Sequence, residues 1–328
     1  MKNILGIGNA LVDVITIVPD ESCLSRFNLP KGSMTMVDAS RSGEIKQAIN
    51  GLNRTMASGG SAGNTIYGLG LMGVNSSFIG KVGRDEMGNF YEKDMVDAGL
   101  KPVLMRAPVS PTGTAVALVT PDSERTFATH LGAATELMAQ ELRTDYFRGY
   151  HILYLEGYLI FNLPLVEQAC ELAKKNHMCV ALDLASYNVV KDMLPAFQKI
   201  VEEYVDILFA NEEEARAFTG LPPVEALDEI SKKTLIAVVK TGADGSWIKR
   251  GDEVIKVEAL KVNAVDTTGA GDLYAAGFLY GFAHGFGLDK CGVFGSILAG
   301  KVIENIGARM TEEKWAEAKA LIAEVAEE

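Results

Sequence analysis

Cysteine is scarce in this chain of 328 residues, and the few thiols are scattered. Only Cys23, Cys170, Cys179 and Cys291 occur, and no two of them form a CxxC pair. This spacing argues against a disulfide scaffold or a cysteine zinc site and favours a reducing compartment, so we expect a cytoplasmic protein. The four histidines have no metal-ligand neighbour at helical spacing, which argues against zinc chemistry.

Positive charge is also in deficit. The chain has 31 Lys and Arg against 43 Asp and Glu, a net charge of −12. Nucleic acid and anionic membranes need a basic face, so we expect neither as a partner. No apolar run approaches the roughly 18 residues of a membrane helix. The apolar stretch at residues 4–18 carries Asn9 and Asp13 and lacks a small-residue cleavage pattern, so it does not read as a secretory signal.

The order of apolar segments predicts an α/β fold. Buried-looking strands alternate with amphipathic segments, which favours a mostly parallel sheet. The expected strands are residues 3–8, 11–18, 77–80, 151–155, 179–184, 205–209 and 236–241, and the expected helices are residues 61–71, 87–98, 164–176, 189–203, 212–219 and 311–327. Residues 15–40 and 110–130 are strand-like instead, and no linker is visible. We therefore expect one domain, residues 1–328, with these two segments inserted as a small β-sheet lid.

Two glycine patterns resemble nucleotide-binding motifs without fitting their context. Residues 68–73 match GxGxxG, but they close a predicted helix, whereas a dinucleotide fingerprint opens one after a strand. An NAD-dependent oxidoreductase is therefore a weak alternative. Residues 295–302 approach a Walker loop, but Val302 replaces the Ser or Thr that would hold magnesium, so we expect a packed helix.

The segment DTTGAGD at residues 266–272 carries the chemistry. We expect it between a strand at 258–265 and an apolar helix at 273–282. Gly269, Ala270 and Gly271 would present free backbone amides at a helix start, which favours a bound phosphate. Asp272 would repel that phosphate, and its place makes sense if it accepts a proton from an attacking hydroxyl group. The alternative is that Asp272 only caps the helix.

This segment resembles the signature of the PfkB family, which contains ribokinase, adenosine kinase and the minor phosphofructokinase. Other positions agree in the family's order over nearly the whole chain. Residues 131–134, 155–159 and 204–209 are most similar to the adenosine kinase branch. The resemblance implies a ribokinase-like three-layer α/β sandwich with a mostly parallel central sheet and a small β-sheet lid.

On the acceptor side, the resemblance implies roles for two N-terminal segments and a lid residue. Residues 8–13 look like the family's first strand, in which Asp13 would bind sugar hydroxyl groups. A buried carboxylate in an apolar strand is costly unless it is paired, although a turn aspartate is the alternative. Residues 58–64 resemble the first signature, which puts Gly59, Gly60 and Asn64 in the sugar pocket. Arg125 would reach substrate or phosphate from the lid, or would be a solvated charge there.

On the nucleotide side, the resemblance implies ATP and Mg²⁺ as cofactors. Residues 211–214 resemble the family's NxxE motif, so Glu214 would organise magnesium through water and Asn211 would bind the nucleotide near the phosphates. Three glutamates at a helix start are otherwise good dipole partners. Further nucleotide-binding positions are Thr241, Gly242, Gly245 and, on the adenine side, Asn305. The resemblance also leaves open a monovalent cation (K⁺) near residues 266–267.

The predicted function is ATP-dependent transfer of the γ-phosphoryl group to a hydroxymethyl oxygen of a sugar or ribonucleoside, with Asp272 as general base. The alternative is a non-catalytic sugar- or nucleoside-binding protein that kept the fold. We expect a small-molecule partner. Whether the lid also pairs with a second copy, giving a homodimer, stays open.

Overall fold

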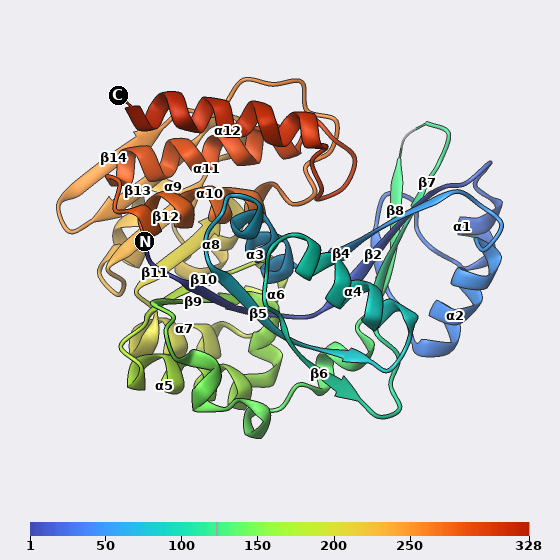
Figure 1. Cartoon of the computed structure of the whole chain (residues 1–328). Helices are drawn as coiled ribbons and strands as arrows, with labels where there is room; N and C mark the ends of the chain where they lie inside the picture. Colours follow the sequence, from blue (N-terminus) through green and yellow to red (C-terminus); the bar gives the residue numbers. More distant parts are fainter. Residues whose placement is uncertain (123, 328) are drawn as a thin grey trace.

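The computed structural model describes every residue except Ser123 and Glu328. Its described residues form a larger and a smaller β-sheet (Figure 1). Within the described residues, the larger sheet has the strand order β14-β13-β12-β11-β10-β9-β1-β5-β6. Its strands are β1 (Ile4–Ile7), β5 (Ser76–Gly83), β6 (Val103–Ala107), β9 (Ile152–Glu156), β10 (Cys179–Asp183), β11 (Ile207–Asn211), β12 (Ile236–Lys240), β13 (Ser246–Arg250) and β14 (Glu253–Val257). In this order, all neighbouring strands from β12 through β6 pair in parallel. The other two strands, β13 and β14, pair antiparallel.

The smaller sheet has the order β3-β8-β7-β2-β4. Its strands are β2 (Leu11–Ile17), β3 (Met34–Met36), β4 (Arg54–Gly59), β7 (Gly113–Val119) and β8 (Arg125–His130). It lies to one side of the larger sheet, with helices α1 (Ser22–Arg26) and α2 (Ala39–Ala48) beside it (Figure 1). The predicted combination of a mostly parallel sheet and a small accessory sheet is confirmed.

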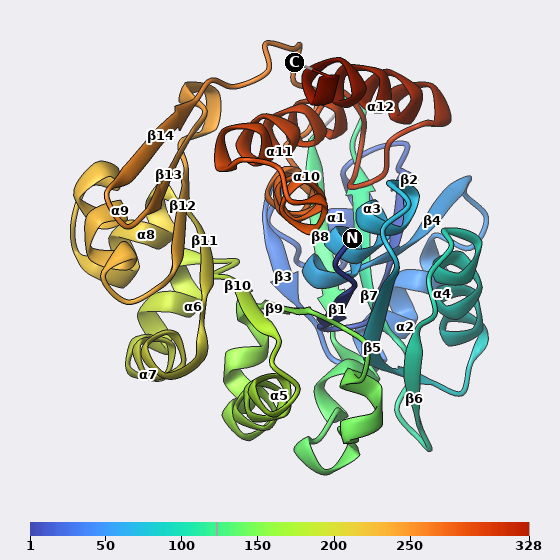
Figure 2. The same ribbon diagram turned by 60° about the vertical axis from the view of Figure 1, so that its left-hand side comes forward.

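Helices cover both faces of the larger sheet and make three layers (Figure 2). One face carries α3 (Ser61–Leu71), α4 (Glu86–Asp97), α10 (Ala270–His284), α11 (Leu288–Val302) and α12 (Glu312–Glu327). The other carries α5 (Leu163–Lys175), α6 (Tyr187–Asp192), α7 (Leu194–Tyr204), α8 (Glu212–Thr219) and α9 (Pro223–Ser231). Because both faces are covered, the central strands are apolar on both sides. None of the described helices combines the length and the apolar character needed to cross a membrane.

The packing explains the two glycine patterns. The GxGxxG stretch closes α3, where a Cβ at Gly70 would lie 2.8 Å from the carbonyl oxygen of Ala98. Residues 295–302 lie inside α11, and a Cβ at Gly295 would lie 2.9 Å from the carbonyl oxygen of Tyr274 on α10. Both stretches therefore have small residues because neighbouring segments approach closely. The packed helix predicted for residues 295–302 is confirmed as part of α11.

Several expected elements are wrong in detail. Residues 8–13 do not form one strand: β1 ends at Ile7, the chain crosses at residues 8–10, and Asp13 lies on β2 of the smaller sheet, within the strand predicted at 11–18. Residues 258–265 form no strand, because polar residues interrupt the segment. It lies along the cavity without regular secondary structure. The helix expected at 189–203 is split into α6 and α7, because Pro195 fits only in the first turn of a helix.

The smaller sheet also includes residues outside the two predicted lid segments, 15–40 and 110–130. It includes β4, which pairs antiparallel with β2, and β2 already begins at Leu11. The sequence of β4, RTMASG, has little of the β-branched or aromatic character that marks a strand. This segment is a strand because it pairs with β2.

Candidate active site

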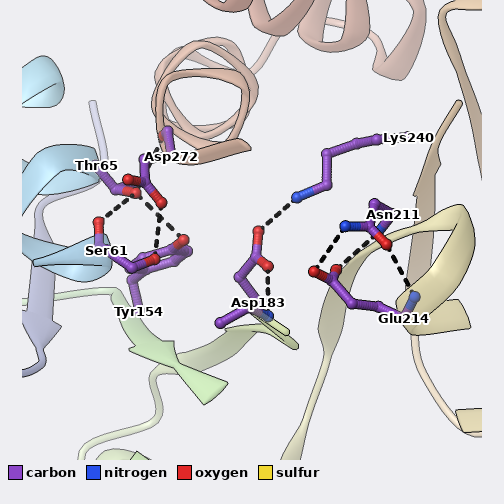
Figure 3. A network of polar contacts seen from close by, with 9 residues as sticks. Ser61, Thr65, Tyr154, Asp183, Asn211, Glu214, Lys240 and Asp272 are labelled. Carbon is purple, nitrogen blue, oxygen red and sulfur yellow. Dashed lines mark hydrogen bonds and ion pairs between the residues drawn. The ribbon is translucent and has the colours of Figure 1, made fainter. Parts of the chain in front are cut away.

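A cavity of about 1520 Å³ lies between the smaller sheet and the carboxyl edge of the larger one. Four neighbouring parallel strands end there in polar residues: Glu156 on β9, Asp183 on β10, Asn211 on β11 and Lys240 on β12. Ligands of open α/β sheets bind outside the carboxyl ends of the strands. Figure 3 shows Asp183, Asn211 and Lys240 of this row, with Asp272 at one end of the view and Glu214 at the other.

Asp272 lies in the first turn of α10 and lines the cavity. Its Oδ1 accepts a hydrogen bond from the Ser61 hydroxyl at 2.7 Å, and its Oδ2 accepts one from the Asn64 amide at 2.9 Å. Burial raises the pKa of Asp272 to about 6, against the opposing effect of these two hydrogen bonds. Both oxygens thus bond to side chains of α3, so within the described residues Asp272 does not act as a helix cap.

The start of α10 is shaped for close approach. Gly269 has a φ of 78°, and a Cβ there would lie 2.7 Å from the Cβ of Ala308. No side chain caps the helix at Gly269, and residues 269–271 all line the cavity. The Ala270 N–H already donates to the Thr267 carbonyl oxygen at 3.1 Å, so an anion would rely on the other amides of this turn, and the anion-binding role of Gly269, Ala270 and Gly271 stays a prediction.

The acceptor-side residues meet where β2 and β4 pair. Gly59 ends β4 and Gly60 is the N-cap of α3. A Cβ at Gly59 would lie 2.3 Å from an Asp13 carboxylate oxygen, and one at Gly60, which has a φ of 86°, would lie 2.0 Å from the carbonyl oxygen of Asn9. Asp13, Gly60 and Asn64 line the cavity. Burial raises the pKa of Asp13 to about 7, although Arg309 opposes this shift. The structure brings Asp13, Asn64 and Asp272 to one end of the cavity.

The nucleotide-side residues Asn211 and Glu214 form a reciprocal cap at the start of α8. Glu214 Oε2 accepts a hydrogen bond from the Asn211 backbone N–H at 2.7 Å, and Asn211 Oδ1 accepts one from the Glu214 N–H at 2.8 Å. Burial raises the pKa of Glu214 to about 7, with Lys240 opposing. Both residues line the cavity, at the other end of the polar row from Asp272 (Figure 3).

The turn after β12 holds the other nucleotide-side candidates. Gly245 has a φ of 87°, and a Cβ there would lie 1.9 Å from the carbonyl oxygen of Val257. Gly242 and Gly245 line the cavity. Thr241 is buried, and its hydroxyl group finds no hydrogen-bond partner among the residues that the structure describes.

Four predicted site residues do not line the cavity: Gly59, Arg125, Thr241 and Asn305. Arg125 forms an ion pair with Asp266, whose carboxylate also accepts a hydrogen bond from the Gly307 N–H at 2.6 Å. Arg125 is thus not a solvated lid charge but connects the smaller sheet to the 266–272 segment. The Asn305 amide donates to the carbonyl oxygen of Lys301 at 3.0 Å. Their roles toward substrate or nucleotide remain predictions.

Sequence reasoning missed the pair of Asp183 and Lys240. Lys240 Nζ lies 2.8 Å from Asp183 Oδ2, and 3.2 Å from the point that a Cβ at Gly271 would occupy (Figure 3). Burial lowers the pKa of Lys240, but the carboxylates around it, Asp183 first and then Glu214, together hold the pKa above its usual value. An ammonium group therefore stands beside the first turn of α10. One feature of the sequence could have indicated this pair: Asp183 and Lys240 are each the charged last residue of an apolar strand.

The residues present fit a nucleotide and magnesium. Among the described residues, no group of three or more His, Cys, Asp or Glu side chains could hold a metal ion alone. Magnesium bound mainly by phosphate oxygens and water needs only one or two protein carboxylates. Glu214, whose oxygens are both engaged by Asn211, suits contact with the metal ion through water.

The chain belongs to the pfkB family of carbohydrate kinases, whose model matches residues 29–315. A crystal structure of adenosine kinase from Sinorhizobium meliloti has 33% sequence identity and a TM-score of 0.86, covering 98% of this chain and 99% of that one. A probable sugar kinase from Rhizobium etli has 32% identity and a TM-score of 0.87, covering 99% of each chain. A nucleoside kinase of Methanocaldococcus jannaschii is 30% identical, over 78% of this chain and 82% of that protein.

These relationships confirm the predicted ribokinase-like fold and the resemblance to the adenosine kinase branch. The chain is a sugar or nucleoside kinase of this family, and ATP use follows from membership. The prediction of an enzyme of the phosphotransferase class is therefore confirmed.

Proposed function

We propose that this kinase transfers the γ-phosphoryl group of ATP to the hydroxymethyl oxygen of a ribosyl compound, with Asp272 as general base. The observation that supports this most is the position of Asp272. Its carboxylate faces the cavity from the first turn of α10, beside uncapped amides, and burial raises its pKa to about 6. A base with a pKa near the working pH is suited to proton transfer.

The proposed step is an in-line displacement. The acceptor hydroxyl group gives its proton to Asp272, its oxygen forms a bond to the γ-phosphorus, and the bond from that phosphorus to the bridging oxygen of ADP breaks. The amides of Gly269 and Gly271 and the Lys240 ammonium group stabilise the charge on the moving phosphoryl group. Magnesium, when bound, neutralises charge on the phosphate oxygens. General-base catalysis contributes about a hundred- to ten-thousand-fold, and positioning and charge stabilisation supply the rest.

The walls around Asp13 favour a ribonucleoside as the acceptor. The sugar-binding groups Asp13 and Asn64 lie beside an apolar wall from the smaller sheet and the segments after it: Leu11, Met34, Met36, Ala115, Phe127, Leu131, Ala134, Tyr158 and Phe161. A planar base can replace water on such a surface, whereas the hydroxyl groups of a hexose would lose hydrogen bonds there. This supports a nucleoside over a simple sugar.

The smaller sheet is proposed to close the site as the lid of a single domain. The chain crosses between the two sheets at residues 8–10, at Gly60 and on both sides of β7 and β8. Closure would keep water from competing as the phosphoryl acceptor. Pairing of this sheet with a second copy stays a prediction.

The test is an ATP-consumption screen combined with a base variant. Adenosine, guanosine, inosine, ribose and hexoses are offered with ATP and Mg²⁺. The Asp272→Asn variant should bind the active acceptor with near wild-type affinity by calorimetry but lose at least a hundredfold in kcat. The matched control is Asp289→Asn, which changes an aspartate in the first turn of α11, outside the cavity.

Retained activity in Asp272→Asn would refute the base assignment. If the wild type binds a nucleoside but consumes no ATP with any acceptor, the non-catalytic alternative holds. Activity on hexoses alone would refute the nucleoside preference and leave the base assignment standing.

A further inference from the structure

A partly buried arginine that no motif contains lies behind the acceptor end of the cavity. Arg309 belongs to the segment between α11 and α12, and its guanidinium group lies over the ring of Tyr67, 3.5 Å from the centroid. One of its Nη atoms donates to the Asn64 Oδ1 at 3.2 Å. The other donates to the backbone carbonyl and, at 2.9 Å, to the hydroxyl group of Ser58.

These contacts hold the guanidinium group on three sides. Ser58 is itself fixed, because its N–H and its hydroxyl group both donate to Asp94 Oδ2, at 2.9 and 2.6 Å. Tyr67 covers the flat face of the guanidinium group, a favourable arrangement for a cation on an aromatic ring. Arg309 does not line the cavity, so it has no direct contact with an acceptor there. Its place is behind Asn64.

The Asn64 amide has a donor side and an acceptor side, and only one orientation suits the site. The NH₂ group must face the Asp272 carboxylate, to which it donates at 2.9 Å. An arginine has only donors, so the Asn64 atom that faces Arg309 must be the oxygen. With the amide reversed, an NH₂ group would face the guanidinium and a carbonyl oxygen would face the carboxylate, and both contacts would repel.

We propose that Arg309 is a positioning residue that fixes the Asn64 amide so that its NH₂ group holds the Asp272 carboxylate. The inference rests on the proposed role of Asp272 as the base. The hydrogen bond from Asn64 lowers the pKa of Asp272 against the raising effect of burial. Without Arg309 the amide turns freely, Asp272 loses a donor for part of the time, and its pKa rises.

The experiment compares kcat against pH for the wild type, Arg309→Met and Arg309→Lys. In Arg309→Met the acid limb of the profile should move up by about half a pH unit or more, and kcat should fall about tenfold. Arg309→Lys keeps the charge but has no planar fork, so its shift should have the same direction and be smaller. The control is Arg106→Met, which removes another arginine that bonds to a backbone carbonyl, outside the cavity.

A double-mutant cycle separates positioning from general stabilisation. If Arg309 acts through Asn64, Arg309→Met should cost little further activity in an Asn64→Ala background. Additive losses, or a wild-type pH profile in Arg309→Met, would overturn the proposal. If thermal unfolding shows that Arg309→Met does not fold, the profile of Arg309→Lys decides, and an unchanged acid limb there overturns it. Activity that survives in Asp272→Asn would instead refute the base assignment itself.

Discussion

The two ends of the cavity are built in different ways. At the acceptor end, the contacts join residues that are far apart in the sequence: Ser61 to Asp272 over 211 residues, and Arg309 to Asn64 over 245. At the nucleotide end, the cap of α8 is local, since Asn211 and Glu214 bond over three residues. The nucleotide end is thus made of short self-contained motifs, while the acceptor end exists only when the whole chain is folded.

The ion pair of Lys240 and Asp183 is the exception at the nucleotide end, since it spans 57 residues, and its removal should have the largest effect on stability. Lys240→Met leaves the Asp183 carboxylate buried without its partner and should lower the free energy of unfolding by about 3–5 kcal/mol. Chemical denaturation measures this loss. The double variant Lys240→Met with Asp183→Asn should recover most of it. A stable single variant would show that this end does not depend on a long-range contact.

A variant of Asp13 tests whether the acceptor end holds a buried carboxylate that destabilises the folded state when it is ionised. Burial raises its folded pKa to about 7, above an unfolded value of about 3.9, so the folded state binds more protons between these values. The contribution of Asp13 to stability therefore falls as the pH rises through that window, and its cost is complete above pH 7.

Asp13→Asn should consequently raise stability by about 1–3 kcal/mol at pH 8 and have little effect at pH 4. The same variant should lose about a hundredfold in kcat/KM for the acceptor if Asp13 binds its hydroxyl groups. Thermal unfolding at both pH values and steady-state kinetics check the two parts. Equal stability changes at the two pH values would contradict the buried-charge argument.

The local character of the nucleotide end predicts a modest stability effect at Asn211. Asn211→Ala removes the side chain that accepts from the Glu214 N–H and should cost about 1 kcal/mol. It should also raise the Mg²⁺ concentration needed for half-maximal activity, because Glu214 loses its orientation. Denaturation and a Mg²⁺ titration measure these effects. A change in acceptor KM instead would show that the two ends are coupled.

The smallest expected effect is a shift in pH dependence at the acceptor end. Because Asp272 must be ionised to accept a proton and burial raises its pKa to about 6, activity should fall as the pH drops through that value. Ser61→Ala removes a hydrogen bond that lowers this pKa, so the acid limb should move up by about half a pH unit. A terminal phosphate also titrates near pH 6, but equally for both proteins, so their difference reports Asp272.

Much of the fold follows from the sequence because parallel strands buried on both faces are continuous apolar runs. Strands β9 to β12 were predicted within one or two residues for this reason. β4 was not, because its residues become a strand only by pairing with β2. The expected strand at 258–265 was wrong, since scattered apolar residues there face the cavity or solvent and have no strand partner.

By itself, the amino-acid sequence determined the local parts of this kinase: the glycine-rich start of α10, the cap of α8 and the alternation of strands and helices. Backbone propensity and near-neighbour hydrogen bonds decide such features within a few residues. Only the tertiary structure decided that Asp13 lies on the smaller sheet, that Lys240 stands beside Gly271 with Asp183, and that Arg309 lies behind Asn64. Contacts between segments up to 245 residues apart depend on how the layers pack, and no local pattern encodes that distance.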